Sequence, residues 1–470
     1  MPDSRASGST QTGLPRRDFL RAMGLGTLGL LARGTLQAQP PRKPNIVVIV
    51  ADDLGYADVG VHGCTDVPTP HIDSIARNGL RFTSGYVSCP VCSPTRAGLV
   101  TARYQQRFGH EFNTGPQSLT PEGAGRGLPL SQITIANVLK QAGYATGIVG
   151  KWHLGMAPEF HPFRRGFDEF FGFLHGGHPY LDPALGTPNP ILRGTDPVDE
   201  KEYLTDAFGR EAVAFLDRHR EHPFFLYLPF NAVHTPLQAP QKYVDRFAAI
   251  EDRKRRTYAA MLSAMDDAIG AVLARLRQHG LERDTLVFFF SDNGGPPNAN
   301  ASSNAPLRGA KGTMYEGGIR VPFLVQWPAR LRAGQVYDQP VISLDVFPTA
   351  AAAAGAAMPA DRPIDGVDLT PFLTGQRAGA PHDALFWRSG ANYAMRRGRH
   401  KLVRLGERAP ELYDLEEDIS EGRDLAAGQG EVVAELTKSL DDWAAQLVAP
   451  LWGAPGRARA RTRRNQQQDD

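Results

Sequence analysis

Residues 46–53 read Ile-Val-Val-Ile-Val-Ala-Asp-Asp, and this stretch is the first indication of the fold. Its five β-branched apolar residues follow one another without polar alternation, which is typical of a strand buried on both faces of a parallel sheet. Three later apolar runs share this design and also lead into polar residues: 144–149, 224–228 and 286–290. The sequence therefore predicts four central strands of one mostly parallel sheet.

Helical patterns separate these runs, at 130–142, 206–218 and 257–278. Strands that alternate with helices predict an α/β sandwich, whose ligand site lies beyond the carboxyl ends of the strands. The polar residues that follow the four runs are therefore expected to meet at one edge of the sheet: Asp52, Asp53, Lys151, His153, His234, Asp292 and Asn293.

The composition of the 470 residues is that of a globular protein, with 41% hydrophobic and 22% charged residues. A net charge of +2 gives no sign of a nucleic-acid partner. The three cysteines are too few for a disulfide framework. The chain has no apolar run near the roughly 20 residues that a membrane span needs, so no permanent membrane anchor is expected.

The N-terminus has the pattern of an export signal. Arg16-Arg17 precedes a short apolar stretch at 22–32, as in substrates of the twin-arginine export machinery. We expect residues 1–38 to be the signal peptide and the mature protein to be periplasmic or secreted. The alternative interpretation of this segment is a disordered basic tail.

Two pairs of polar residues suggest a metal site. Asp52, Asp53, Asp292 and Asn293 offer only oxygen ligands, which suit Ca²⁺ or Mg²⁺ better than zinc. Taken singly, each pair is equally consistent with residues of strand-end turns or helix caps.

Residues 92–96, Cys-Ser-Pro-Thr-Arg, form the most specific motif of the sequence. Ser93 and Pro94 are a good N-cap and first-turn pair, so a helix is expected to start just after Cys92. A nucleophile at the positive end of a helix, with Arg96 one turn along, would face an anionic substrate. Cys89 and Cys92 also form a C-x-x-C pair, and the alternatives are a redox pair or half of a zinc site.

With Leu99, Thr101 and Arg103, this motif resembles the signature of the type I sulfatases of the alkaline phosphatase superfamily, except that Ala102 stands where the family usually has Gly. Further segments are similar to family blocks: 70–76, 150–155, 165–170, 234–236, 291–294, 307–313, 316–322 and 411–415.

The resemblance implies a large, mostly parallel sheet sandwiched by helices, followed by a small C-terminal antiparallel sheet with a helix. Residues 393–404 alternate like strands, and residues 430–447 look like an amphipathic helix. We therefore expect a catalytic domain over 39–370, a smaller subdomain over 371–455 and a disordered polar tail over 456–470.

The resemblance also implies a mechanism. A formylglycine-generating enzyme would oxidise Cys92 to formylglycine, whose hydrate attacks the sulfur of a sulfate ester. Ca²⁺ would be bound by residue 92 together with Asp52, Asp53, Asp292 and Asn293.

Five further side chains would act around the transferred group. Arg96 and Lys151 would hold the formylglycine and neutralise charge, His234 and Lys311 would assist the leaving alcohol, and His153 would take the proton whose loss expels sulfate.

Sugar or aryl sulfates are the expected substrates. A loop over 176–195 and the segment 104–113 are expected near the site. His175, His178 and Tyr180 are candidate substrate contacts, and the alternative is that they are turn residues. The alternatives are a related phosphodiesterase or phosphonate monoester hydrolase, and a non-catalytic metal- or glycan-binding protein that keeps the Cys92 thiol.

Overall fold

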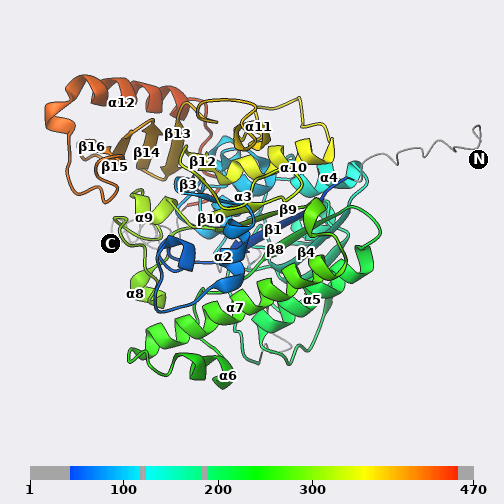
Figure 1. Cartoon of the computed structure of the whole chain (residues 1–470). Helices are drawn as coiled ribbons and strands as arrows, with labels where there is room; N and C mark the ends of the chain where they lie inside the picture. Colours follow the sequence, from blue (N-terminus) through cyan, green and yellow to red (C-terminus); the bar gives the residue numbers. More distant parts are fainter. Residues whose placement is uncertain (1–42, 116–119, 121–122, 183–187, 454–470) are drawn as a thin grey trace, which may run out of the picture. The chain divides into compact units, whose positions relative to one another are not determined.

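A computed structural model describes residues 43–115, 120, 123–182 and 188–453 (Figure 1). The predicted signal peptide and polar tail lie outside the described residues. A ten-stranded sheet runs through the described part in the order β11-β2-β10-β9-β1-β8-β4-β5-β6-β7. The strands are β1 (Asn45–Ala51), β2 (Leu80–Phe82), β4 (Ala145–Lys151), β5 (Glu169–Phe173), β6 (Leu192–Arg193), β7 (Asp196–Pro197), β8 (Phe224–Pro229), β9 (Thr285–Ser291), β10 (Phe323–Gln326) and β11 (Gln335–Tyr337).

The four predicted strands are the four adjacent central strands of this sheet. Strand β1 pairs in parallel with β8 on one side and β9 on the other, and β4 pairs in parallel with β8. All seven residues of β1 are buried. The prediction of a mostly parallel sheet is therefore confirmed, and the carboxyl ends of these strands share one edge.

Helices cover both faces of the sheet (Figure 1). Val47 and Ile49 of β1 belong to the apolar cluster that includes the helices of one face, whereas Ile46 and Val48 belong to the cluster of the other. The first face carries α2 (Pro70–Arg77), α5 (Leu204–His219) and α7 (Arg253–Gln278), and the second carries α3 (Cys92–Thr101), α4 (Ile135–Gln141) and α10 (Val346–Ala354).

Two local predictions need correction. The helix expected over 130–142 begins only at Ile135, because Thr134 caps it and forms a capping box with Asn137. The loop expected over 176–195 includes β6, which pairs antiparallel with β5 near the sheet edge.

The C-terminal part forms a separate four-stranded antiparallel sheet, as expected. Its strands are β13 (Leu385–Ser389), β14 (Asn392–Arg397), β15 (His400–Leu405) and β16 (Glu411–Asp414), followed by α12 (Gly430–Ala444). Leu436, Leu440 and Trp443 of α12 share an apolar cluster with Tyr86 and Ile342 of the larger part. The small sheet is thus packed onto the larger one through a common core.

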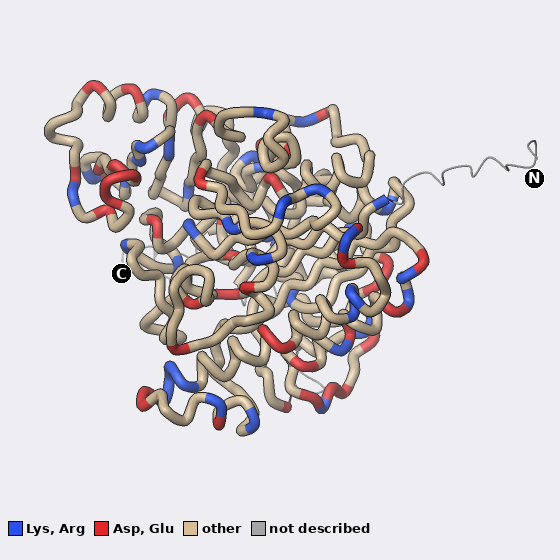
Figure 2. The backbone as a smooth tube through the Cα atoms, in the orientation of Figure 1, with Lys and Arg blue, Asp and Glu red and all other residues tan. Residues whose placement is uncertain are grey.

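Short elements complete the described chain: β3 (Gly85–Tyr86), β12 (Val341–Ile342), α6 (Gln241–Val244), α8 (Pro297–Asn300), α9 (Glu316–Ile319) and α11 (Thr370–Leu373). Among the described helices, none combines the length and apolar character needed to cross a membrane. Basic and acidic residues are interspersed along the described chain (Figure 2).

Candidate active site

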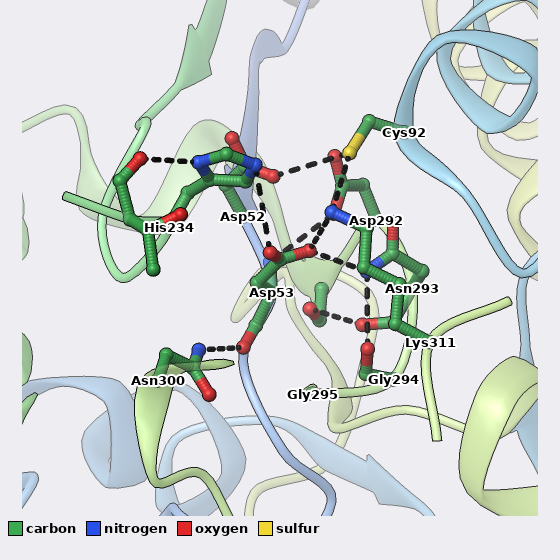
Figure 3. Close-up of polar contacts among 12 residues, drawn as sticks. Asp52, Asp53, Cys92, His234, Asp292, Asn293, Gly294, Gly295, Asn300 and Lys311 are labelled. Carbon is green, nitrogen blue, oxygen red and sulfur yellow. Dashed lines mark hydrogen bonds and ion pairs between the residues drawn. The ribbon is translucent and has the colours of Figure 1, made fainter. Parts of the chain in front are cut away.

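The carboxyl ends of β1 and β9 bring the two predicted polar pairs together (Figure 3). Asp52 and Asp53 follow β1, and Asp292 and Asn293 follow β9. The backbone NH of Asp53 donates to Oδ1 of Asp292 at 3.3 Å, and Nδ2 of Asn293 donates to Oδ1 of Asp53 at 2.7 Å. All four side chains are buried. The sequence prediction that these residues meet is confirmed.

The turn after β1 is held by residues from two other segments. Asp53 has a φ of 62°, which non-glycine residues seldom adopt. Nδ2 of Asn300 donates to the carbonyl of Asp53 at 3.0 Å, and the NH of Asp52 donates to the carbonyl of Ala232 at 2.9 Å. The sequence analysis missed Asn300, because no motif marks it within a polar Asn-rich segment.

The carboxylate and amide oxygens of the site fit a hard divalent cation, whereas a cysteine sulfur and a histidine nitrogen are softer ligands. One ligand atom each of Asp52, Asp53, Cys92 and His234 lies within 4.8 Å of the others. Oδ1 of Asn293 is buried and, within the described residues, accepts no hydrogen bond. A buried carbonyl oxygen without a donor beside carboxylates is suited to metal coordination.

Asp292 forms its ion pair with an arginine. Its Oδ2 accepts from Nε and Nη2 of Arg96 at 3.0 and 2.8 Å. Burial and the charge of Asp52 raise the pKa of Asp292. A divalent cation beside Asp292 would favour its ionised form.

Two lysines compensate the other carboxylates. Nζ of Lys151 lies 2.5 Å from Oδ2 of Asp52, and Nζ of Lys311 lies 2.6 Å from Oδ1 of Asp53. Although burial disfavours ionisation of Asp52, Lys151 and the other cations lower its pKa well below the ordinary value. The site therefore keeps fixed positive charges next to its carboxylates.

Cys92 is the first residue of α3 and is almost fully buried. Lys311 Nζ donates to its sulfur at 3.3 Å, and the sulfur donates to Oδ1 of Asp52 at 3.5 Å. Burial raises the pKa of the Cys92 thiol, and the charge of Asp292 adds to this effect. An unmodified Cys92 is therefore a protonated thiol and a weak nucleophile at neutral pH.

Ser93 does not cap α3 as expected; the N-cap is Val91. The Ser93 hydroxyl is used elsewhere: it donates to the carbonyl of His153 at 2.7 Å and lies 2.6 Å from Nε2 of His110. Its two partners are remote in sequence, so the local N-cap pattern could not reveal them.

His153 and His234 line a cavity of about 470 Å³ that also contains Cys92. Burial and the charge of Lys151 hold the pKa of His153 well below its ordinary value. His153 is therefore a neutral imidazole near the thiol. Nε2 of His234 lies 3.6 Å from Oδ2 of Asp53, and its Nδ1 lies 2.6 Å from the carbonyl of Thr235.

Of the three candidate substrate contacts, His175 and His178 line this cavity and Tyr180 does not. Tyr180 is fully buried, and its hydroxyl donates to the carbonyl of His234 at 2.8 Å. It supports the His234 turn, so its assignment as a substrate contact was wrong. From the segment 104–113, Asn113 lines the cavity and accepts from the NH of Ser93 at 2.9 Å.

Carboxylates suited to a cation, with fixed positive charges around one reactive position, are what transfer of an anionic ester group requires. Fold and site together define a class: hydrolases of anionic esters built on a mostly parallel α/β sheet. Comparisons with known proteins specify the family. The Sulfatase family model matches residues 44–356, and the model of the N-sulphoglucosamine sulphohydrolase C-terminal region matches 310–446. The chain belongs to the sulfatase family and is an enzyme that hydrolyses sulfate esters.

Similar proteins include mouse N-acetylgalactosamine-6-sulfatase, 37% identical over 402 residues that cover 80% of this chain and 74% of that protein. Human arylsulfatase A is 34% identical over 484 residues, covering 90% and 92% of the two chains. The crystal structure of Ps i-CgsB in complex with k-i-k-neocarrahexaose superposes with a TM-score of 0.84 at 36% identity, covering 90% of this chain and 97% of that one.

Proposed function

We propose that this chain is an exported, calcium-dependent sulfatase that removes sulfate from a carbohydrate through a formylglycine made from Cys92. The observation that carries the proposal is the position of the Cys92 sulfur, 3.3 Å from Nζ of Lys311 and 3.5 Å from Oδ1 of Asp52.

Addition of water to the formylglycine aldehyde would give a geminal diol, which provides one hydroxyl for attack and a second whose deprotonation releases sulfate and restores the aldehyde. Asp52, Asp53, Asp292 and Asn293 would hold Ca²⁺, which supplies positive charge for the sulfate oxygens. The oxygen-rich donor set supports calcium or magnesium, and the family resemblance favours calcium.

The remaining polar residues of the site would each have one role. Arg96 and Lys151, both fully buried, fix residue 92 and neutralise negative charge. Neutral His153 accepts the proton of the second hydroxyl. His234 and Lys311 lie on the Asp53 side of the site and would stabilise or protonate the leaving oxygen.

The relatives support a sulfated carbohydrate as substrate, since one is named for N-acetylgalactosamine 6-sulfate and another was solved with a neocarrahexaose. The twin-arginine pattern at Arg16-Arg17 supports export by the twin-arginine machinery. We further propose that residues 39–370 form the catalytic domain, with 371–455 as a subdomain at its side.

The first test is the mass of the peptide containing Cys92, from protein made with and without a formylglycine-generating enzyme. A formyl group in place of the thiol, with hydrolysis of sulfated sugars that Cys92→Ala abolishes, would support the proposal. An unmodified thiol in fully active protein would refute it. Matched aryl sulfate and aryl phosphate esters test the alternative, because a phosphodiesterase would prefer the phosphate.

A further inference from the structure

A second cavity, of about 670 Å³, adjoins the one that contains Cys92. Asn113 lines both cavities. Val91 and Gly312 also line the second cavity, and they are the chain neighbours of Cys92 and Lys311. The second cavity therefore begins directly beside the reactive position.

The far wall of this cavity comes from the C-terminal sheet. It consists of the turn 389–392 between β13 and β14 and the turn 405–408 after β15. Phe112 and Tyr315 add partly exposed aromatic rings, and the Arg308 guanidinium lies over one face of Tyr315, 3.9 Å from the ring centroid. Asn392 adds an amide. Aromatic faces with a few polar groups suit a sugar ring, which has apolar faces and a polar rim.

The charge in the lining of this cavity is positive. Its lining includes Arg408 and neither Asp nor Glu. Among the described residues, the exposed Arg408 side chain forms no hydrogen bond or ion pair that would neutralise it, whereas Arg404 in the preceding strand pairs with Asp441 at 2.9 Å. The acidic side chain adjacent in sequence, Glu407, does not line the cavity. Arg408 is thus free to bind an anionic ligand.

We infer that the second cavity binds the next unit of a sulfated oligosaccharide and that Arg408 binds a second anionic group on that unit. The inference rests on the proposed function, and it adds selectivity for substrates with at least two anionic groups. A guanidinium binds sulfate or carboxylate through two parallel hydrogen bonds, which a neutral sugar cannot accept with the same strength.

The test compares Arg408→Gln with the native enzyme on three substrates: 4-nitrophenyl sulfate, a singly sulfated carrageenan-type oligosaccharide and its doubly sulfated counterpart. Loss of the charge-assisted hydrogen bonds should lower kcat/KM for the doubly sulfated substrate about 10- to 100-fold. The two singly charged substrates should change less than about twofold, because neither reaches Arg408 with an anionic group. Equal changes on all three substrates, or none, would overturn the inference.

A matched control is Arg423→Gln, which removes an exposed arginine of the C-terminal part that does not line the cavity. It should leave all three rates unchanged. Binding separates this inference from the proposed function. In the Cys92→Ala background, Arg408→Gln should weaken calorimetric binding of the doubly sulfated oligosaccharide about 10- to 100-fold, whether or not the native protein hydrolyses it. Equal affinities in that background would refute the role of Arg408.

Discussion

Lys311 is the residue whose position says most about the chemistry, because one ammonium group contacts both Cys92 and Asp53. Burial would lower its pKa, but the negative charges of Asp53 and Asp52 hold the pKa well above its ordinary value. Lys311 therefore stays charged over the working pH range. A permanent cation is suited to stabilise a leaving oxygen and unsuited to serve as a base.

We predict that Lys311→Ala lowers kcat/KM for a sugar sulfate about 100-fold or more, whereas 4-nitrophenyl sulfate loses about tenfold or less. The reason is that a sugar alkoxide needs stabilisation when it leaves, and nitrophenolate needs little. Steady-state rates on both esters measure the difference. Lys254→Ala, on the exposed surface, should change neither rate. Equal losses on both esters would show that Lys311 has no role at the leaving oxygen.

The pKa of His153 predicts the acidic limb of the pH profile. Burial and the charge of Lys151 hold this pKa well below its ordinary value of 6.5, so the imidazole is a neutral base at neutral pH. Protonation at lower pH removes the base, so kcat should rise with pH through a pKa below 6.5 and then level off. His175 is a further charge that lowers the pKa of His153, so His175→Gln should move the limb to higher pH. A limb at or above pH 6.5 in the native enzyme would contradict the assignment.

At the scale of residues, the sequence could predict the site residues that directly follow parallel strands, because their partners in the site also follow such strands. Asp52, Asp53, Asp292 and Asn293 were predictable because the ends of adjacent parallel strands must meet. Ser93 was misassigned because both partners of its hydroxyl lie far along the chain.

Tyr180 was misassigned for the same physical reason, since its hydroxyl binds carbonyls of another loop. Ala102 has a φ of 56° at the end of α3, a conformation in which glycine is unstrained. This geometry explains the usual family glycine at that position.

At the scale of elements, the small sheet holds the segment that carries Lys311. Nζ of Lys401 in β15 lies 2.8 Å from a carboxylate oxygen of Glu316 and 2.8 Å from one of Glu421, and all three side chains are fully buried. Glu421 also accepts from the NH of Glu316 at 2.7 Å. A buried cation between two carboxylates thus joins β15 to the start of α9, five residues after Lys311.

We predict that Lys401→Met destabilises the protein by about 3–5 kcal/mol, because buried Glu421 loses its cation and buried Glu316 keeps its pair with Arg320 but loses the one with Lys401. The free energy of unfolding in urea measures this loss. The matched control is Lys438→Met in the exposed pair with Asp442, where the loss should be about 0.5 kcal/mol or less. A similar small loss for both variants would mean that the buried pairs do not stabilise this packing.

The pH dependence of stability at Glu421 provides a second test of the buried cluster of Lys401, Glu316 and Glu421. Burial raises its pKa to about 7, despite the nearby charge of Lys401. At pH 6 the folded protein therefore holds a proton on Glu421 that the unfolded chain releases, so this group favours folding less as pH rises from about 4 to 7. Glu421→Gln removes this contribution, so the slope of the unfolding free energy against pH should become more positive across this window, as urea titrations at several pH values would measure. An unchanged slope would contradict the raised pKa.

The predictability of the elements follows from their burial. The four central strands could be predicted because strands covered on both faces are continuously apolar. Strand β10 has the same apolar character but pairs antiparallel with β9 and β2, and periodicity carries no information on strand direction. The two-residue strands β6 and β7 are too short to produce a periodic pattern.

At the scale of the whole molecule, the reactive position joins distant parts of the chain. Residues after β1, β9 and β8 surround Cys92, and the C-terminal turns bound the adjoining cavity. Composition and motifs could predict this chemistry but not the cavity, because its walls come from residues near 91, 113, 313, 390 and 408. A cation bound at this site would therefore affect the free energy of unfolding of the whole chain as well as the hydrolysis reaction.

We predict that Ca²⁺ at 100 times its Kd stabilises the fold by about 2.7 kcal/mol, equivalent to a rise in Tm of about 3 °C for a chain of this size. The unfolded chain does not bring Asp52, Asp53, Asp292 and Asn293 together, so Ca²⁺ binds the folded state selectively. Thermal unfolding of EGTA-treated protein, titrated with Ca²⁺ and separately with Mg²⁺, measures this effect. Mg²⁺ should stabilise less, because it requires a tighter octahedral shell.

The control for this titration separates the site from general ion effects. Asp53→Asn should abolish the calcium-dependent rise in Tm. Asp66→Asn, which removes a partly exposed carboxylate paired with Arg255, should keep it. If Asp53→Asn kept the full rise, calcium would bind elsewhere and the proposed ligand set would be wrong. If the rise were lost but the rate on sulfate esters stayed constant, the cation would stabilise the fold without taking part in hydrolysis.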